Sequence, residues 1–212
     1  MTFSEIIRPY SGQPLTRQLL LNLLKDYKRP FDKLSELVRQ ELLTPVKRGI
    51  FIPGPASKVD QPEPFLLANH LAGPSYVSLE TALSHWQLIP EHVFEVSSMT
   101  TGRSKIYQTP VGRFSYTHLP LPYYAFGQQR LQFTTDQAAL VAIPEKAVCD
   151  MIVATSGLRF RSQDQLRAWL IDDMRMDTEV LRTLNTTLIN DWLSDAPKKD
   201  SLYLLIQTLD KL

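Results

Sequence analysis

A proline-rich stretch near residue 60 divides the chain into two unequal parts. Between Pro53 and Pro64 the sequence holds four prolines, one glycine and few large apolar residues. Proline fixes the backbone and removes a hydrogen-bond donor, so a regular helix or central strand does not run through such a segment. At 212 residues the chain is long for one domain and short for three. We therefore expect two domains, residues 1–58 and 59–212.

The segment before this stretch has the apolar spacing of two short helices. Apolar residues recur every three or four positions over 15–27, and again over 31–43 after the break at Pro30. Tyr27 and Phe31 fall on the apolar faces, so both are expected to point inward. The two patterns predict two amphipathic helices that pack against each other.

A short β-ribbon is expected after the second helix. Apolar residues flank Lys47, Arg48 and Gly49, a pattern that indicates two strands joined by a tight basic turn. Two helices followed by such a ribbon predict an N-terminal winged helix-turn-helix. A complete unit has three helices, so one more helix is required within residues 3–14 or at the turn 26–29.

The second part of the chain alternates between helical and strand patterns. Helical spacing covers 65–71 and 79–86, and strand-like segments cover 93–99, 114–119 and 140–143. Pro144 stands where a further helix would begin. We expect the polar loop 100–105 to join the first two strands, and a tail of helices from Arg159 onward. The sequence thus predicts an α+β fold, with the winged helix-turn-helix followed by a mixed α+β domain that has a helical C-terminal tail.

Charge is distributed unevenly along the chain. The net charge is +1, yet the first 60 residues hold ten basic and six acidic side chains. Because phosphate neutralisation supplies most sequence-independent affinity for nucleic acid, DNA contact is expected in this part. The candidate DNA-binding residues lie on the second helix, the turn before it and the ribbon, namely Lys28, Arg29, Lys33, Arg39, Lys47 and Arg48. The alternative is a solvated helix face, because acidic residues are interleaved with these cations.

The residue pattern offers little for catalysis or metal binding. The four histidines lack the short spacing of metal-binding pairs, and the lone Cys149 has the apolar neighbours of a core residue. Glu145, Lys146 and Asp150 invite a metal-dependent nuclease reading. Adjacent helix positions diverge by about 100°, however, and the spacing of Lys146 and Asp150 favours an ordinary helix ion pair. We therefore expect a protein that is not an enzyme and holds no metal or cofactor.

The same pattern bears on the cellular location. No apolar run approaches the roughly 20 residues that a membrane-spanning helix needs. The first ten residues include Glu5 and lack the apolar region of a signal peptide. We therefore expect a cytoplasmic protein without a membrane partner.

Short motifs follow one another in a characteristic order between residues 15 and 155. The N-terminal ones include 23–27 and 47–51, and the central ones cover 73–83, 88–91, 109–114 and 142–147. This series resembles the AbiE-type antitoxin family, the antitoxin component of type IV toxin–antitoxin systems that act in abortive phage infection. The resemblance does not extend to the helical tail from Arg159.

The resemblance implies a winged helix that represses its own operon and an α+β domain needed to neutralise a partner toxin. The implied partners are operator DNA at the protein's own promoter, with inverted repeats, and a toxin encoded nearby that looks like a nucleotidyltransferase. Inverted repeats require two copies, either as a dimer or as two monomers on the DNA. The candidates for toxin neutralisation or anion contact are the basic residues on or near the predicted hairpin, Arg103, Lys105 and Arg113.

Three other functions remain open from the sequence. The chain could be a stand-alone winged-helix transcriptional regulator without a toxin. A metal-dependent nuclease and a module that binds only proteins are the other two alternatives.

Overall fold

The computed structural model describes residues 2–212, which form a mixed α+β fold with two sheets. The N-terminal unit contains three helices and a small antiparallel sheet with strand order β1-β3-β2. Its elements are α1 (Phe3–Ile7), β1 (Leu15–Thr16), α2 (Arg17–Leu23), α3 (Pro30–Arg39), β2 (Leu43–Lys47) and β3 (Ile50–Pro53), with single 3-10 turns at Arg8–Tyr10 and Pro55–Ser57. Helix α1 lies within residues 3–14, one of the two segments in which the winged-helix prediction expects a third helix.

Side-chain caps define where the first helices begin. The Thr2 hydroxyl accepts a hydrogen bond from the Glu5 amide, and the Glu5 carboxylate accepts one from the Thr2 amide, which makes a capping box for α1. The Thr16 hydroxyl accepts from the Leu19 amide and caps α2. The apolar faces of these helices then meet in a small core that includes Ile7 and Leu20.

The predicted boundaries of the first two helices were too wide. Leu15 pairs with Phe51 in the small sheet, so α2 starts only after the Thr16 cap. Helix α3 ends at Arg39 because Glu41 adopts a left-handed backbone with φ of 55°, a common way to end a helix. Tyr27 and Phe31, expected to point inward, are 44% and 60% exposed.

The second unit is built on a six-stranded sheet with strand order β6-β7-β5-β4-β9-β8. Its strands are β4 (Ser75–Val77), β5 (Val96–Thr100), β6 (Lys105–Thr109), β7 (Gly112–His118), β8 (Gln128–Gln132) and β9 (Ala138–Ala142). Its helices are α4 (Pro64–Leu71), α5 (Leu79–His85) and α6 (Pro144–Ala154), and a 3-10 turn covers Tyr123–Ala125. The predicted helices at 65–71 and 79–86 and the helix that starts at Pro144 are confirmed.

The prediction that loop 100–105 joins the strands at 93–99 and 114–119 in a hairpin was wrong. Strands β5 and β7 are neighbours but run parallel, and β6 lies between them in sequence. Strand β6 pairs antiparallel with β7 at the edge of the sheet, through a tight turn at Gly112 with φ of 133°. The sequence pattern missed β6 because three of its five side chains are exposed, as at an edge.

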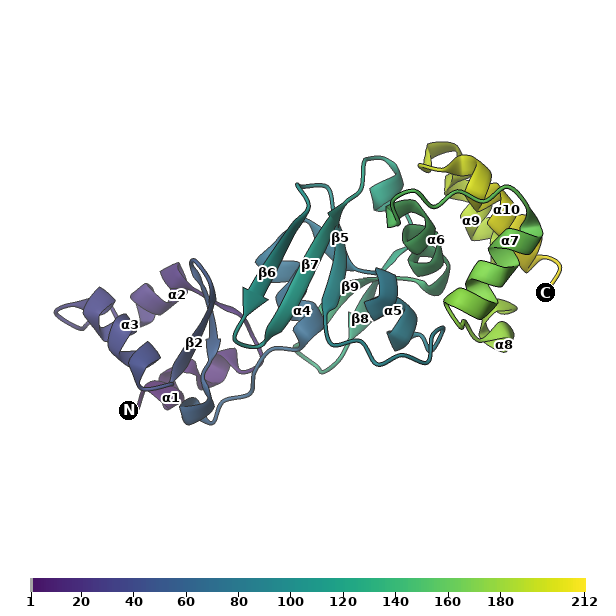
Figure 1. Cartoon of the computed structure of the whole chain (residues 1–212). Helices are drawn as coiled ribbons and strands as arrows, with labels where there is room; N and C mark the ends of the chain where they lie inside the picture. The colour runs from purple at the N-terminus through teal and green to yellow at the C-terminus, as the bar shows by residue number, and fades with distance from the viewer. Residues whose placement is uncertain (1) are drawn as a thin grey trace.

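The C-terminal helices cover the other end of the sheet unit (Figure 1). They are α7 (Gln163–Ala168), a π-helical turn at Trp169–Asp173, α8 (Thr178–Leu181), α9 (Thr186–Trp192), a 3-10 turn at Leu193–Asp195 and α10 (Lys199–Leu209). Their apolar faces join the same core as the sheet, through residues such as Leu170 and Leu205. The predicted helical tail is therefore confirmed, and its apolar stripes serve as core.

The β2–β3 hairpin lies between the two units. Leu43 and Phe51 pack into the N-terminal core, whereas Val46 and Ile52 belong to the larger core of the second unit. Alternate residues of a strand point to opposite faces, so the neighbours Phe51 and Ile52 serve different cores. The hairpin thus joins the units, and only its turn projects.

Within residues 2–212, no helix combines the length and the apolar character needed to cross a membrane.

Candidate nucleic-acid interface and a buried ion pair

Helix α3, the turn before it and the β2–β3 turn carry four exposed cations, while Arg8, Arg17, Lys25 and Lys58 are exposed elsewhere on the N-terminal unit. Lys28, Arg29 and Arg39 are exposed at the two ends of α3, and Arg48 is exposed at the turn. Gly49 permits this tight turn, because its φ of 86° is a left-handed conformation that favours glycine. Figure 1 shows both in the N-terminal unit, with α3 at its outer side and the hairpin on the side that faces β6.

Two cations of α3 are partly neutralised by neighbouring carboxylates. The Lys33 ammonium lies 3.1 Å from Glu36, and the hydrogen bond from Lys33 lowers the pKa of the Glu36 carboxyl. The Arg29 guanidinium lies 3.7 Å from Asp32, with both side chains largely exposed. Such surface pairs are weak, on the order of 0 to 1 kcal/mol, so a phosphate can compete for these cations.

Lys28, Arg39 and Arg48 are not held in ion pairs within the described residues, although the charge of Arg39 helps to lower the pKa of the Glu36 carboxyl. Among residues 2–212, no ion pair involves any of the three. They are therefore the cations of this surface that can meet a phosphate without first losing a partner.

Lys47 does not fit the predicted contact with DNA. Its ammonium donates a 2.7 Å hydrogen bond to the carbonyl of Leu71, at the end of α4, and lies 5.0 Å from the centre of the Tyr107 ring. The side chain is half-buried between the two units. Lys47 therefore holds the hairpin against the second unit, and we leave it out of the DNA contacts proposed below.

The three basic residues predicted to form an anion site are not brought together. Lys105 lies at the start of β6, with its ammonium 5.8 Å from the Tyr107 ring, and Arg103 is exposed in the loop just before it. Arg113 lies toward the other end of the β6–β7 pair, opposite Gln108, and its guanidinium is 2.8 Å from Glu95. The structure thus leaves Arg103 and Lys105 as neighbours and places Arg113 in a separate ion pair.

A fully buried ion pair lies under the six-stranded sheet. The Lys146 ammonium and the Asp150 carboxylate, one turn apart on α6, are 2.6 Å from each other, and both side chains are 0% exposed. The other Asp150 oxygen accepts hydrogen bonds of 2.8 Å from the Tyr76 and Ser78 hydroxyls. The Lys146 ammonium also lies 3.4 Å from the centre of the Tyr123 ring.

This environment shifts the ionisation of the groups around the pair. Burial lowers the pKa of the Lys146 amine, although Asp150 acts in the opposite direction. Burial raises the pKa of the Tyr76 hydroxyl well above its usual value, and the Asp150 charge adds to this shift. Burial also raises the pKa of the Cys149 thiol to about 12, as fits the core position predicted for it.

The same geometry separates the three residues on which a nuclease site would depend. Glu145 turns away from the pair and accepts a 2.9 Å hydrogen bond from the Asn185 amide, before α9. The predicted helix ion pair between Lys146 and Asp150 is confirmed, but its complete burial was not anticipated. Within the described part of the chain, no three His, Cys, Asp or Glu side chains are grouped as a metal site requires.

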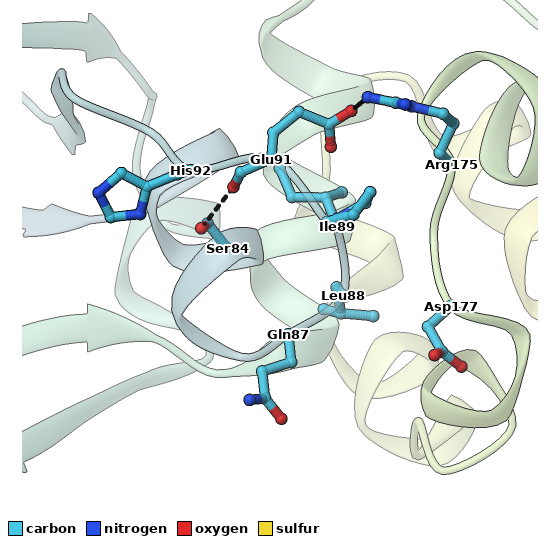
Figure 2. Close-up of a pocket in the computed structure, with 9 residues that line it drawn as sticks. Ser84, Gln87, Leu88, Ile89, Glu91, His92, Arg175 and Asp177 are labelled. Carbon is cyan, nitrogen blue, oxygen red and sulfur yellow. Dashed lines mark hydrogen bonds and ion pairs between the residues drawn. The ribbon is translucent and has the colours of Figure 1, made fainter.

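A polar cavity of about 410 Å³ lies where the C-terminal helices meet the loop after α5 (Figure 2). Glu91 and Arg175 form an ion pair at this cavity, and the Glu91 carbonyl accepts a 2.8 Å hydrogen bond from the Ser84 hydroxyl. Asp177 caps α8 by accepting from the Glu179 and Val180 amides. Because these groups already satisfy one another, we interpret the cavity as part of the attachment of the tail. The sequence could not predict it, since its two walls are far apart along the chain.

Comparisons of the sequence with known protein families and with characterised proteins find no match. The resemblance to AbiE-type antitoxins therefore stays a prediction.

Proposed function

We propose that the chain is a DNA-binding transcriptional repressor whose N-terminal unit is a winged helix-turn-helix. The observation that carries this proposal is the element order α1, β1, α2, α3, β2, β3 around a small β1-β3-β2 sheet. A winged helix has this arrangement: three helices packed against an antiparallel hairpin whose turn projects. In this assignment α3 is the recognition helix and the β2–β3 turn is the wing.

The charges of this surface support the same assignment. Arg48 on the turn and Lys28 and Arg39 at the ends of α3 would contact phosphates, which position the protein without reading sequence. Arg29 and Lys33 would exchange their weak carboxylate contacts for phosphate. Repression would follow when the bound protein blocks access to a promoter.

The test is binding of the purified protein to DNA from upstream of its own gene, over a series of salt concentrations. Each phosphate contact contributes about 0.9 to the slope of log affinity against log salt. We expect Arg48→Ala to weaken binding and to reduce this slope by about one unit. Fluorescence anisotropy with a labelled duplex provides both quantities.

The matched control is Arg167→Ala, which removes an exposed arginine from α7 at the far end of the molecule. This variant should keep the slope and affinity of the unmodified protein. An unrelated duplex of equal length separates specific from nonspecific binding. Absence of binding at low salt, with the protein folded, would rule out the repressor proposal.

We further propose, on the resemblance to AbiE-type antitoxins, that the repressor belongs to a type IV toxin–antitoxin pair. Expression of the adjacent gene alone should then arrest growth, and co-expression of this chain should restore it. If no adjacent product is toxic while DNA binding persists, the protein is a stand-alone regulator. No residue in either proposal performs a chemical step.

A further inference from the structure

Two aromatic side chains are exposed where α3 begins. Phe31, the second residue of α3, is 60% exposed, and Tyr27 in the preceding turn is 44% exposed. Large apolar side chains left in water forgo the stabilisation that burial provides. Leu34 and Leu37, three and six positions further along α3, are buried, so the helix already has its core contacts without Phe31.

Phe31 lies on a solvent-facing stripe of α3 together with polar residues. Ser35 follows it by one turn and Arg39 by two, and both are exposed. The Ser35 hydroxyl donates a 3.1 Å hydrogen bond to the Phe31 carbonyl one turn earlier. A recognition helix presents such a stripe to the edges of the bases, with its N-terminal residues inserted most deeply.

The surroundings of Phe31 indicate the chemistry of its partner. Lys28 and Arg29 precede it in the chain, and the Lys33 ammonium lies 5.5 Å from the centre of the Tyr27 ring. Phe31 therefore lies beside three cations, although Arg29 pairs with the adjacent Asp32. Such a surface suits a partner that is acidic at its edges and apolar at one point. The major groove of DNA has that character wherever a thymine methyl projects between the two phosphate backbones.

We propose that Phe31 is a specificity-determining residue that packs against the C5-methyl group of a thymine in the major groove. This inference rests on the proposed function and deepens it, because it assigns a base contact where the cations give only backbone contacts. The protein would then prefer a T·A pair at the position that Phe31 contacts. Its affinity would not depend on the methyl groups of thymines that Phe31 does not contact.

The experiment removes the methyl from the DNA and the ring from the protein. The region protected by the protein is first mapped on its own upstream DNA, and each thymine within it is then replaced in turn by deoxyuridine, which lacks only that methyl. For the unmodified protein, one replacement should weaken binding about fourfold, the value of one buried methyl group. For Phe31→Ala the same replacement should have no effect, so that the two changes are strongly non-additive.

The matched control is Phe94→Ala, which removes a phenylalanine that is 87% exposed in the loop before β5 and outside the N-terminal unit. It should keep the full response to deoxyuridine. Because Phe31 contributes little to the core, Phe31→Ala should unfold at the same urea concentration as the unmodified protein.

The outcomes separate this inference from the proposed function. If the unmodified protein binds its upstream DNA but no deoxyuridine replacement weakens it, or the replacement weakens Phe31→Ala equally, the methyl contact is wrong and the repressor proposal stands. If the unmodified protein does not bind that DNA at all, the repressor proposal fails, and the base contact fails with it.

Discussion

Asp150→Ala is expected to lower the free energy of unfolding by about 3 to 5 kcal/mol, the usual cost of leaving one member of a buried ion pair without its partner. The substitution leaves the buried Lys146 ammonium without a carboxylate partner, and it removes the acceptor for the hydrogen bonds of the Tyr76 and Ser78 hydroxyls. Urea denaturation followed by tryptophan fluorescence measures this loss, because Trp86, Trp169 and Trp192 all lie in the second unit.

Two further variants show that the charge causes the loss. The double variant Lys146→Met/Asp150→Leu removes both charges and should be more stable than Asp150→Ala. Glu179→Ala removes one partner of the exposed ion pair with Arg182 and should cost less than about 1 kcal/mol. If Asp150→Ala unfolds within about 1 kcal/mol of the unmodified protein, the pair is not isolated from water as described.

The loss should also depend on pH. Asp150→Ala removes the main group that offsets the effect of burial, so the pKa of Lys146 falls further below its ordinary value of 10.5 in the folded state. Between that lowered pKa and 10.5 the unfolded chain binds more protons than the folded one, so stability rises with pH. The difference from the unmodified protein should therefore shrink as pH rises toward 10.5.

Elements governed by local pattern could be predicted from the sequence. Helices α4 and α5 follow from apolar spacing alone, and α6 follows from Pro144 at its first position. The unequal charge of the first 60 residues pointed to the same surface that the fold places on α3 and the β2–β3 turn.

Features set by distant segments could not be predicted. The parallel pairing of β5 with β7 depends on where β6 and β4 lie in the sheet, and no local pattern encodes that order. The direction of Lys47 depends on Leu71 and Tyr107, which come from another unit. In the same way, the spacing of Lys146 and Asp150 predicts an ion pair, but the burial of that pair results from Tyr76 and Tyr123.

The exposure of Phe31 shows how one pattern can mislead about function. Its spacing relative to Leu34 resembles that of a core residue, and on spacing alone the side chain is assigned inward. In α3 the buried side chains are Leu34 and Leu37, so the core-facing side of the helix is centred between these two, and Phe31 on the first turn lies beyond its edge. A polar environment made by Lys28 and Arg29 was the available signal that this position faces solvent.

The position of α3 depends on a close backbone contact at Gly54, and we expect Gly54→Ala to lower the stability of the N-terminal unit by about 3 kcal/mol. A Cβ atom at residue 54 would overlap the carbonyl oxygen of Glu41 and would lie 2.9 Å from the Leu43 amide nitrogen. These are backbone atoms that cannot rotate away, unlike the end of a flexible side chain. The Gly54 amide also donates a 3.0 Å hydrogen bond to the Leu42 carbonyl, so any shift of the chain disturbs that bond as well.

Because Glu41 lies two residues after the end of α3, the displaced backbone should move α3 relative to the β2–β3 turn. Amide hydrogen exchange should therefore become faster over 30–43 and stay unchanged in α6, and affinity for upstream DNA should fall although no cation has been removed. Gly102→Ala is the matched control, since its Cβ would meet only the Thr100 hydroxyl at an ordinary 3.5 Å. That variant should stay within about 0.5 kcal/mol of the unmodified protein. Unchanged exchange over 30–43 in Gly54→Ala would mean that this contact does not hold α3 in place.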